Sequence, residues 1–135
     1  MHEPLSSGPE ELNRQPVILR RSDWAVDDQH WRGHIEGTSL GTGITVLFYA
    51  TEQAGEGPRW HVHTYDEVFI VRVGRALFTI GDQKIEAQAG DVLMGPAHIP
   101  HKYHNLGPGP LQTTDIHLSE RWVQTNLDDP ELSNG

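Results

Sequence analysis

Two closely spaced histidines and a glutamate could bind one metal ion together. His61 and His63 are two residues apart, so on a β-strand both rings would lie on one face, with their Cα atoms about 6.6 Å apart. Glu67 follows four residues later. On a straight strand its Cα would lie about 13 Å from that of His63, which is too far for a shared ion. We therefore predict that the chain reverses at residues 64–66, so that Glu67 opens a return strand beside the histidines.

A third imidazole comes from a later part of the chain. His101 opens a predicted strand after a loop bracketed by Pro96 and Pro100. Three imidazoles and one carboxylate suit one divalent ion of iron, manganese, nickel, zinc, cobalt or copper, and they suit Ca²⁺ or Mg²⁺ poorly. Four protein ligands would leave two positions of an octahedron open for substrate. The His-x-His pair alone would also fit two surface histidines, but its combination with Glu67 and His101 favours a metal site.

Short strands must position these side chains. The chain is rich in turn-forming Gly (14) and Pro (9), and β-branched and aromatic residues gather in short runs between them. This pattern predicts an all-β sandwich or barrel. One short helix is expected at residues 120–127. The predicted strands cover residues 17–19, 23–26, 30–35, 44–51, 67–73, 75–80, 84–87, 91–94, 102–106 and 111–118.

Size and composition narrow the classes of function. With 135 residues, the chain suits one domain. A formal net charge of −9, with only 10 Lys and Arg, argues against nucleic acid or an anionic membrane as a partner. The absence of Cys excludes disulfides, thiolate metal sites and Cys nucleophiles. The longest unbroken apolar run is residues 46–50, so we expect no transmembrane helix or signal peptide, and a cytoplasmic protein.

Three segments are expected along the chain. Residues 1–16 contain three prolines and little apolar periodicity, which is typical of a flexible N-terminal arm. The alternative is an arm that becomes ordered on a partner subunit. Residues 17–127 would form the β-barrel domain, and residues 128–135 would form a C-terminal tail.

The spacing of the candidate ligands resembles the two sequence motifs of the cupin superfamily, in particular its small bacterial single-domain members. The first motif, G(x)5HxH(x)3-4E(x)6G, is matched by Gly55, His61, His63, Glu67 and Gly74. The second motif, G(x)5PxG(x)2H(x)3N, is matched by Gly90, Pro96, His101 and Asn105. The departure is His98, which stands where the motif has a Gly that permits a turn with positive φ.

The resemblance implies a double-stranded β-helix, or jelly-roll, barrel that holds a metal ion inside and commonly forms a homodimer. Members of the superfamily include dioxygenases, decarboxylases, sugar isomerases and ligand-binding domains, so the fold does not decide the chemistry. A dioxygenase-type oxidoreductase is the first expectation. A metal-dependent isomerase or Lewis-acid enzyme is the alternative, and a non-catalytic small-molecule binding or sensor protein is a third possibility.

Two further histidines are candidate catalytic residues. His98 could reach over the mouth of the pocket as a general acid or base, or it could lie in an exposed loop. His117 shares a strand face with Thr113 and Asp115. If that face points into the barrel, His117 belongs to a polar pocket wall and could transfer protons; if it points outward, the alternate residues of the strand form the core. The strand pattern leaves both orientations open.

Four other residues are candidate lining residues of a substrate pocket. Arg59 has the strand parity of His61 and could bind a substrate carboxylate, or it could be an exposed loop residue. Tyr49, Phe69 and Tyr103 are candidate pocket walls, although single aromatic residues more commonly pack in a core. The expected partner is therefore a small molecule.

Overall fold

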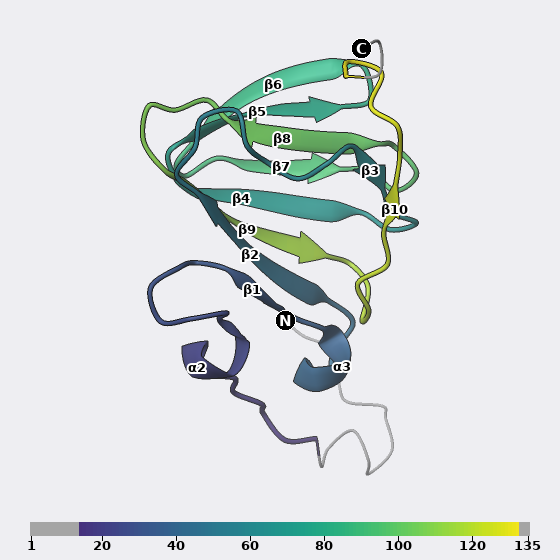
Figure 1. The fold of residues 1–135 in the computed structure, drawn as a ribbon. Helices are drawn as coiled ribbons and strands as arrows, with labels where there is room; N and C mark the ends of the chain where they lie inside the picture. The colour runs from purple at the N-terminus through teal and green to yellow at the C-terminus, as the bar shows by residue number, and fades with distance from the viewer. Residues whose placement is uncertain (1–13, 133–135) are drawn as a thin grey trace, which may run out of the picture.

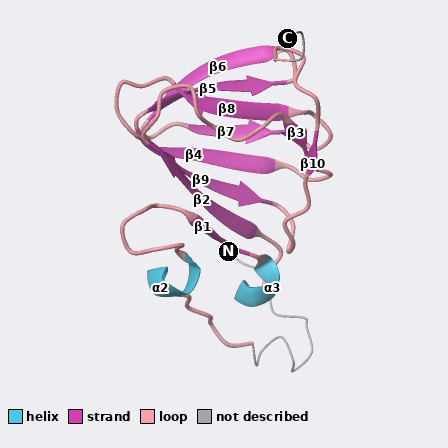
Figure 2. Cartoon of the chain, in the orientation of Figure 1, coloured by secondary structure: helices cyan, strands magenta, loops and turns pink. Residues whose placement is uncertain are grey.

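The computed structural model describes residues 14–132 and consists of two antiparallel β-sheets that face each other (Figure 1). Within these residues, helix is limited to two short segments beside β1, namely α2 (Arg21–Trp24) and α3 (Gly37–Leu40) (Figure 2). The predicted all-β, jelly-roll architecture is confirmed. None of the helices in this part of the chain has the length and apolar character that crossing a membrane requires.

One sheet carries the strands in the order β1-β2-β9-β4-β7. All neighbours in it are antiparallel, and β9 lies between β2 and β4, with which it shares its longest ladders. The strands are β1 (Gly33–Ile35), β2 (Thr45–Thr51), β4 (Glu67–Val73), β7 (Val92–Gly95) and β9 (Leu111–His117).

The second sheet carries the strands in the order β10-β3-β8-β5-β6, and here too all neighbours are antiparallel. Its short strands β3 and β10 form one end, while β5, β6 and β8 form the larger part of its surface. The strands are β3 (His61–Val62), β5 (Arg75–Ile80), β6 (Gln83–Gln88), β8 (His101–Asn105) and β10 (Thr125–Asn126).

Alternation along the strands decides which side chains enter the barrel. On β9 every second residue from Leu111 to His117 is buried, and on β8 the odd-numbered residues are buried. The core between the sheets contains Phe69 and Val71 from β4, Phe78 from β5, and Tyr103 from β8. Alternation with period two places one face of each strand inside, as the predicted patterns require.

The outer face of the first sheet is partly covered by the segment that precedes β1. The Trp24 ring stacks on Phe48 with a centroid distance of 3.6 Å, and Trp31 packs edge-on against the same ring. The Trp31 indole N–H also donates to the Thr113 carbonyl oxygen at 3.1 Å. These contacts attach residues 20–32 to the sheet, so Trp24 and Trp31 pack within the chain. Most of the predicted N-terminal arm, residues 1–13, lies outside the described residues.

Three predicted elements are wrong. Residues 120–127 form no helix but an extended segment that ends in β10, because long-range bonds use its backbone: Trp122 N–H donates to Glu36 and Val123 N–H to the Tyr65 hydroxyl. Residues 17–19 form no strand. Residues 23–26 begin inside α2 and contribute only an isolated bridge between Ala25 and Gly33.

Candidate metal centre

Two connected turns bring the four candidate ligands together. His61 lies on β3 and is paired in register with His101, the first residue of β8. The chain then turns after His63 and crosses to the other sheet, where Glu67 opens β4. The predicted reversal at residues 64–66 is therefore present. This turn contacts the loop that precedes β8, because Asp66 accepts a hydrogen bond from the Ala97 backbone N–H at 2.8 Å.

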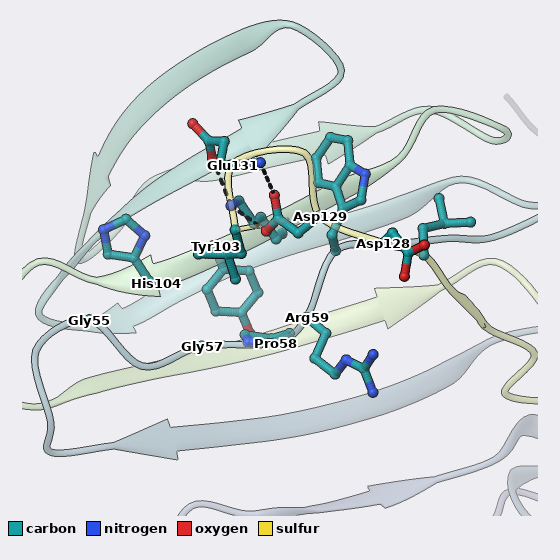
Figure 3. A pocket seen from close by; sticks show the side chains of 13 residues that line it. Gly55, Gly57, Pro58, Arg59, Tyr103, His104, Asp128, Asp129 and Glu131 are labelled. Carbon is teal, nitrogen blue, oxygen red and sulfur yellow. Dashed lines mark hydrogen bonds and ion pairs between the residues drawn. The ribbon is translucent and has the colours of Figure 1, made fainter. Parts of the chain in front are cut away.

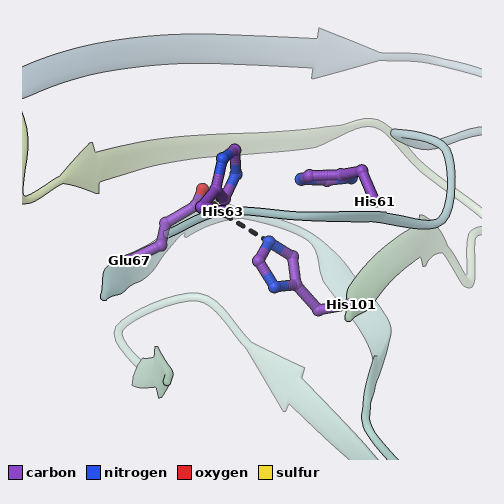
Figure 4. A group of neighbouring side chains, drawn as sticks. All are labelled: His61, His63, Glu67 and His101. Atoms are coloured by element: carbon purple, nitrogen blue, oxygen red, sulfur yellow. Dashed lines mark hydrogen bonds and ion pairs between the residues drawn. The ribbon is translucent and has the colours of Figure 1, made fainter. Parts of the chain in front are cut away.

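The four side chains are buried and point toward one another (Figure 4). One potential ligand atom from each of His61, His63, Glu67 and His101 lies within 4.8 Å of all the others. The Glu67 Oε1 atom is 3.0 Å from Nε2 of His63 and 3.0 Å from Nε2 of His101. This is the convergence that the sequence predicts.

In each of the three candidate histidine ligands, Nδ1 faces away from the centre and forms a hydrogen bond, which leaves Nε2 available to bind a metal. Nδ1 of His61 bonds to the Arg59 carbonyl, Nδ1 of His63 to the Val123 carbonyl at 2.7 Å, and Nδ1 of His101 to the Ile99 carbonyl at 3.3 Å. A carbonyl oxygen only accepts, so each Nδ1 carries the proton, and in a neutral ring Nε2 has a free lone pair. Such support of a ring by its second nitrogen is usual for metal-ligating histidines.

One inner nitrogen is buried without a hydrogen bond. His63 Nε2 has no hydrogen-bond partner among the described residues, although it lies beside the Glu67 carboxylate. Two atoms with lone pairs that face each other in a buried site are unfavourable unless a proton or a cation lies between them. A divalent ion satisfies this donor set, so the residues present fit a transition metal.

The buried environment shifts the pKa values of two of the candidate ligands, His61 and Glu67. It lowers the pKa of His61 to about 4, assisted by the neighbouring His101 and only partly opposed by the bond to the Arg59 carbonyl. Burial alone would raise the pKa of Glu67. The contacts of its carboxylate oxygens with the rings of His101, His117 and His63 outweigh that effect and hold this pKa well below its usual value. A neutral His61 and an ionised Glu67 are the forms that bind a metal.

His117 points into the barrel and bonds to the other oxygen of Glu67. Its Nε2 lies 3.2 Å from Glu67 Oε2, and its Nδ1 lies 2.7 Å from the Tyr65 hydroxyl. Of the two orientations that the sequence leaves open, the inward one is therefore correct. Hydrogen bonding of a ligating carboxylate is a common way to fix its orientation.

Tyr65 is a site residue that the sequence analysis does not identify. Burial raises its pKa to about 12, so the hydroxyl stays protonated. The same hydroxyl bonds to the backbone of Val123, at 2.9 Å to the carbonyl oxygen and at 3.1 Å to the N–H. Its only local signal is its place in the turn between His63 and Glu67. Its partners lie 52 and 58 residues further along the chain.

A cavity of about 340 Å³ opens onto this centre. Glu67, His61 and His117 line it from the barrel interior. The predicted pocket residues Arg59, Tyr49 and Tyr103 also line it. The other lining residues include Arg32, His34, Leu47, Asp115, Trp122 and Gln124.

One predicted pocket residue, Phe69, and one predicted catalytic residue, His98, do not line this cavity. Phe69 is buried in the core, where its ring packs against Phe78 and against the outer side of His101, with centroids 5.1 and 5.2 Å apart. It shares the face of Glu67 but lies deeper along β4. His98 lies exposed in the loop before β8, where it has a φ of 68°, and only its backbone N–H reaches the site, through a 2.8 Å bond to the His63 carbonyl.

A larger cavity of about 580 Å³ lies on the outer side of the second sheet (Figure 3). It is bordered by Lys102 and His104, whose side chains alternate with the inward residues of β8. Lys102 holds the C-terminal segment there through Asp129 at 2.6 Å and Glu131 at 2.7 Å. None of the four candidate ligands lines this cavity, whereas His61 and Glu67 line the smaller one.

Two curated relatives match part of the chain. An uncharacterized protein of Methanocaldococcus jannaschii is 38% identical over 53 residues, which are 38% of this chain and 42% of the relative. An uncharacterized protein of Streptomyces coelicolor is 35% identical over 63 residues, which are 47% of this chain and 59% of the relative. The chain thus spans about half the length of the curated relatives it matches.

Solved structures with the same fold cover most of the chain. A cupin protein from Bacteroides fragilis matches with a TM-score of 0.61 and 25% identity over 91% of this chain and 95% of its own. An oxalate decarboxylase of Lactobacillus farciminis, in complex with formate, has a TM-score of 0.71 and 18% identity over 90% of this chain and 41% of its own. A Bacillus subtilis oxalate decarboxylase described for its Mn(II) centres has a TM-score of 0.66 and 19% identity, with 94% of this chain and 35% of its own covered.

A family model agrees with the fold and with the site. The model for the cupin domain matches residues 48–117, which include both turns of the metal centre and slightly more than half of the chain. The resemblance inferred from the two motifs is confirmed, and the chain belongs to the cupin domain family.

Proposed function

We propose that this cupin binds one divalent transition metal through His61, His63, Glu67 and His101 and acts on a small molecule in the cavity above it. The observation that carries the proposal is the buried convergence of four donor atoms within 4.8 Å, with the far side of each imidazole already bonded to a carbonyl. A bound metal would supply Lewis acidity and, if it is redox-active, a site for reaction with O₂.

The chain's own residues bind and orient the substrate. Arg59 and Arg32 line the cavity, and the Arg59 side chain has no partner among the described residues. A guanidinium without an acidic partner is suited to bind a carboxylate. Trp122 and His34, whose rings pack edge to face with centroids 5.0 Å apart, add aromatic surface to the same cavity. The preferred substrate is therefore a small molecule with metal-chelating oxygens and an acidic group.

Dioxygenase-type oxidation is the reaction we propose first. Its support is the donor set: three imidazoles and one carboxylate suit iron and other redox-active ions, and they leave two positions of an octahedron for substrate and O₂. A redox-neutral reaction of a small acid, such as decarboxylation or isomerisation, is the alternative. The oxalate decarboxylases with the same fold, one of them described for its Mn(II) centres, favour it.

Metal analysis and oxygen uptake together test this proposal. The protein is purified without chelator and loaded separately with Fe(II) and Mn(II), and metal content is measured by mass spectrometry. Oxygen uptake is then recorded with catechols, enols and small hydroxy acids. The matched variants are His61→Ala and His101→Ala, which each remove one ligand, and His104→Ala, which removes a histidine from the outer face of the same strand as His101.

We expect close to one metal per chain in the wild type and in His104→Ala, and metal content near background in the two ligand variants. Oxygen consumption that requires metal supports the dioxygenase class, and turnover of an acid without oxygen consumption supports the alternative. Tight binding of a probe without turnover points to a binding protein. Full metal content in both ligand variants would place the metal elsewhere and contradict the proposal.

A further inference from the structure

A second buried polar group lies in the barrel beside the four candidate ligands. Its members are Tyr103 on β8 and Thr113 and Asp115 on β9, from opposite sheets. The Tyr103 hydroxyl lies 2.7 Å from Asp115 Oδ2 and 2.9 Å from Thr113 Oγ1. The three residues are between 0% and 3% exposed.

One oxygen of this group has no partner. Asp115 Oδ2 is held by Tyr103, but Oδ1 is buried and forms no hydrogen bond with any described residue. Asp115 nevertheless lines the cavity that also contains Glu67, His61 and His117. A buried carboxyl oxygen without a partner is unfavourable, and buried polar atoms are nearly always bonded. We therefore look for the missing partner in a molecule bound in this cavity, which Asp115 lines.

Size and charge restrict what this partner can be. Asp115 is only 3% exposed and Oδ1 itself is buried, so only a single small polar atom that comes into direct contact with Oδ1 can bond to it, and a bulky group cannot. The Glu67 carboxylate acts on Asp115 electrostatically, which disfavours a second anion. An ammonium group would bring three donors into a site with one free acceptor, and the unpaired donors would be costly to bury. A hydroxyl can donate to a carboxylate or accept from a carboxylic acid, so it suits either form of Asp115.

We propose that Asp115 is a specificity-determining residue that binds a hydroxyl group of the ligand through Oδ1. The ligand class is then a small polyoxygenated molecule, with two oxygens for the metal and a further hydroxyl for Asp115. This inference rests on the proposed metal site, because chelation brings the ligand to this end of the cavity. Tyr103 and Thr113 are positioning residues, since the Tyr103 hydroxyl holds Oδ2 and Thr113 bonds to that hydroxyl, which leaves Oδ1 as the free oxygen.

Matched ligand pairs test the assignment on zinc-loaded protein, where no oxidation of the probe occurs at the metal. Glycerate is compared with lactate, and pyrogallol with catechol, under anaerobic conditions by titration calorimetry. In each pair both molecules chelate through two neighbouring oxygens, and only the first has an additional hydroxyl. The quantity compared between proteins is the ratio of the two dissociation constants, which removes differences in chelation alone.

For at least one pair we expect the wild type to prefer the hydroxylated member by at least about tenfold, because a site built to bond a hydroxyl rejects an analogue that lacks it. Asp115→Leu removes the bonding atoms at similar size and should reduce this preference to near one. Asp115→Asn keeps a hydrogen-bonding group and should retain most of it. Asp82→Leu, in the exposed turn between β5 and β6, is the control and should behave as the wild type.

The outcomes separate this proposal from the metal proposal. Zinc content is measured first in every protein. Normal zinc content with equal binding of both members of each pair, with no binding of any probe, or with a preference that survives in Asp115→Leu overturns the role of Asp115 alone. Absence of zinc binding in the wild type overturns the proposed function and this inference with it.

Discussion

At each histidine of the centre, the nitrogen that faces outward determines what the inward nitrogen can do. Backbone carbonyls occupy Nδ1 of His61, His63 and His101, so the lone pairs of all three rings are directed inward. His117 differs, because its Nδ1 faces the Tyr65 hydroxyl and its Nε2 faces Glu67 Oε2. The Tyr65 hydroxyl donates to the Val123 carbonyl oxygen, and His117 Nε2 lies 3.2 Å from Glu67 Oε2, where it donates to the carboxylate when it carries a proton. His117 is thus a positioning residue for a metal ligand.

This role predicts graded effects on metal affinity. His117→Leu leaves Glu67 Oε2 without its bond and should weaken metal binding about 10- to 100-fold, as is typical when the support of a ligand is lost. His117→Gln, whose amide can donate to the carboxylate, should restore part of the loss, and Tyr65→Phe should have a smaller effect of the same sign. Competition with a chelator measures affinity, and the visible spectrum of the Co(II) form reports ligand geometry. An unchanged spectrum and affinity in His117→Leu would contradict the positioning role.

The lowered pKa of His61 predicts how the metal-free protein responds to acid. Its ordinary pKa is 6.5 and its folded value about 4, so between these values the unfolded chain binds a proton that the folded chain does not. Stability contributed by the neutral His61 is complete above pH 6.5 and is lost as the pH falls to 4, by roughly 3 kcal/mol. Asp115 contributes with the opposite sign, because its pKa is raised by burial and by Glu67.

A matched comparison isolates the His61 contribution. Denaturant unfolding of metal-free wild type and His61→Gln is followed across this range of pH, and the difference between them cancels the effects of Asp115 and Glu67. The wild type should lose more stability than the variant as the pH falls from 6.5 to 4. Parallel curves would show that His61 is not buried in its neutral form.

At the scale of the elements, local patterns predicted the strands better than the segments between them. The run from Arg75 to Ile80 alternates and ends at a Gly-Asp turn, and it forms β5 as expected. The helix expected at residues 120–127 failed because its backbone is bonded to Tyr65 and Glu36, which are distant in sequence. Propensity is local, so it contains no information about such partners.

The difference between local patterns and contacts distant in sequence also explains which parts of the candidate site could be predicted. His61, His63 and Glu67 could be placed together because their spacing lies within one strand–turn–strand unit. The orientation of His117 could not be decided from the sequence, since the neighbouring Ile116 is apolar and could equally have faced the core. In the structure Ile116 lies half-buried on the other face of β9. Phe69 was assigned to the pocket by its parity with Glu67, but parity does not say how far along a strand the cavity extends.

The loop before β8 contains the one departure from the family motif, His98. Substitutions at this residue test its backbone conformation directly. His98 has a φ of 68°, a left-handed conformation that Gly adopts without the steric cost of a Cβ. We expect His98→Gly to change the free energy of unfolding little or to raise it by up to about 1 kcal/mol. His98→Val should lower it by about 1–2 kcal/mol, because β-branched residues tolerate this region poorly. Denaturant titration measures both, and equal stability of the two variants would contradict this conformation.

At the scale of the whole molecule, the first sheet has an uncovered apolar strip on its outer face. The register of β4 with β7 places Val68 beside Met94 and Ile70 beside Val92, and these side chains point away from the barrel. Val92 is 63% exposed and Met94 53% exposed. The strip contains no charged side chain, whereas the chain has a net charge of −9, so contact through it avoids repulsion between copies.

We therefore predict a homodimer that uses this strip. Light scattering coupled to size exclusion should give twice the 15.1 kDa mass of the chain. A charged substitution in the strip, Met94→Lys, should shift the protein toward the monomer, whereas Lys84→Glu, on β6 of the other sheet, should not. A wild type of 15.1 kDa at all concentrations would reject the dimer.

The metal centre joins the two sheets of the molecule, with His61 and His101 in one and Glu67 in the other. The most direct test is a crystal structure of the zinc-loaded protein with the ion located by anomalous scattering. We predict one peak about 2.0–2.2 Å from Nε2 of all three histidines and from a Glu67 oxygen. A structure in which these atoms surround no ion, while zinc binds elsewhere on the chain, would contradict the account.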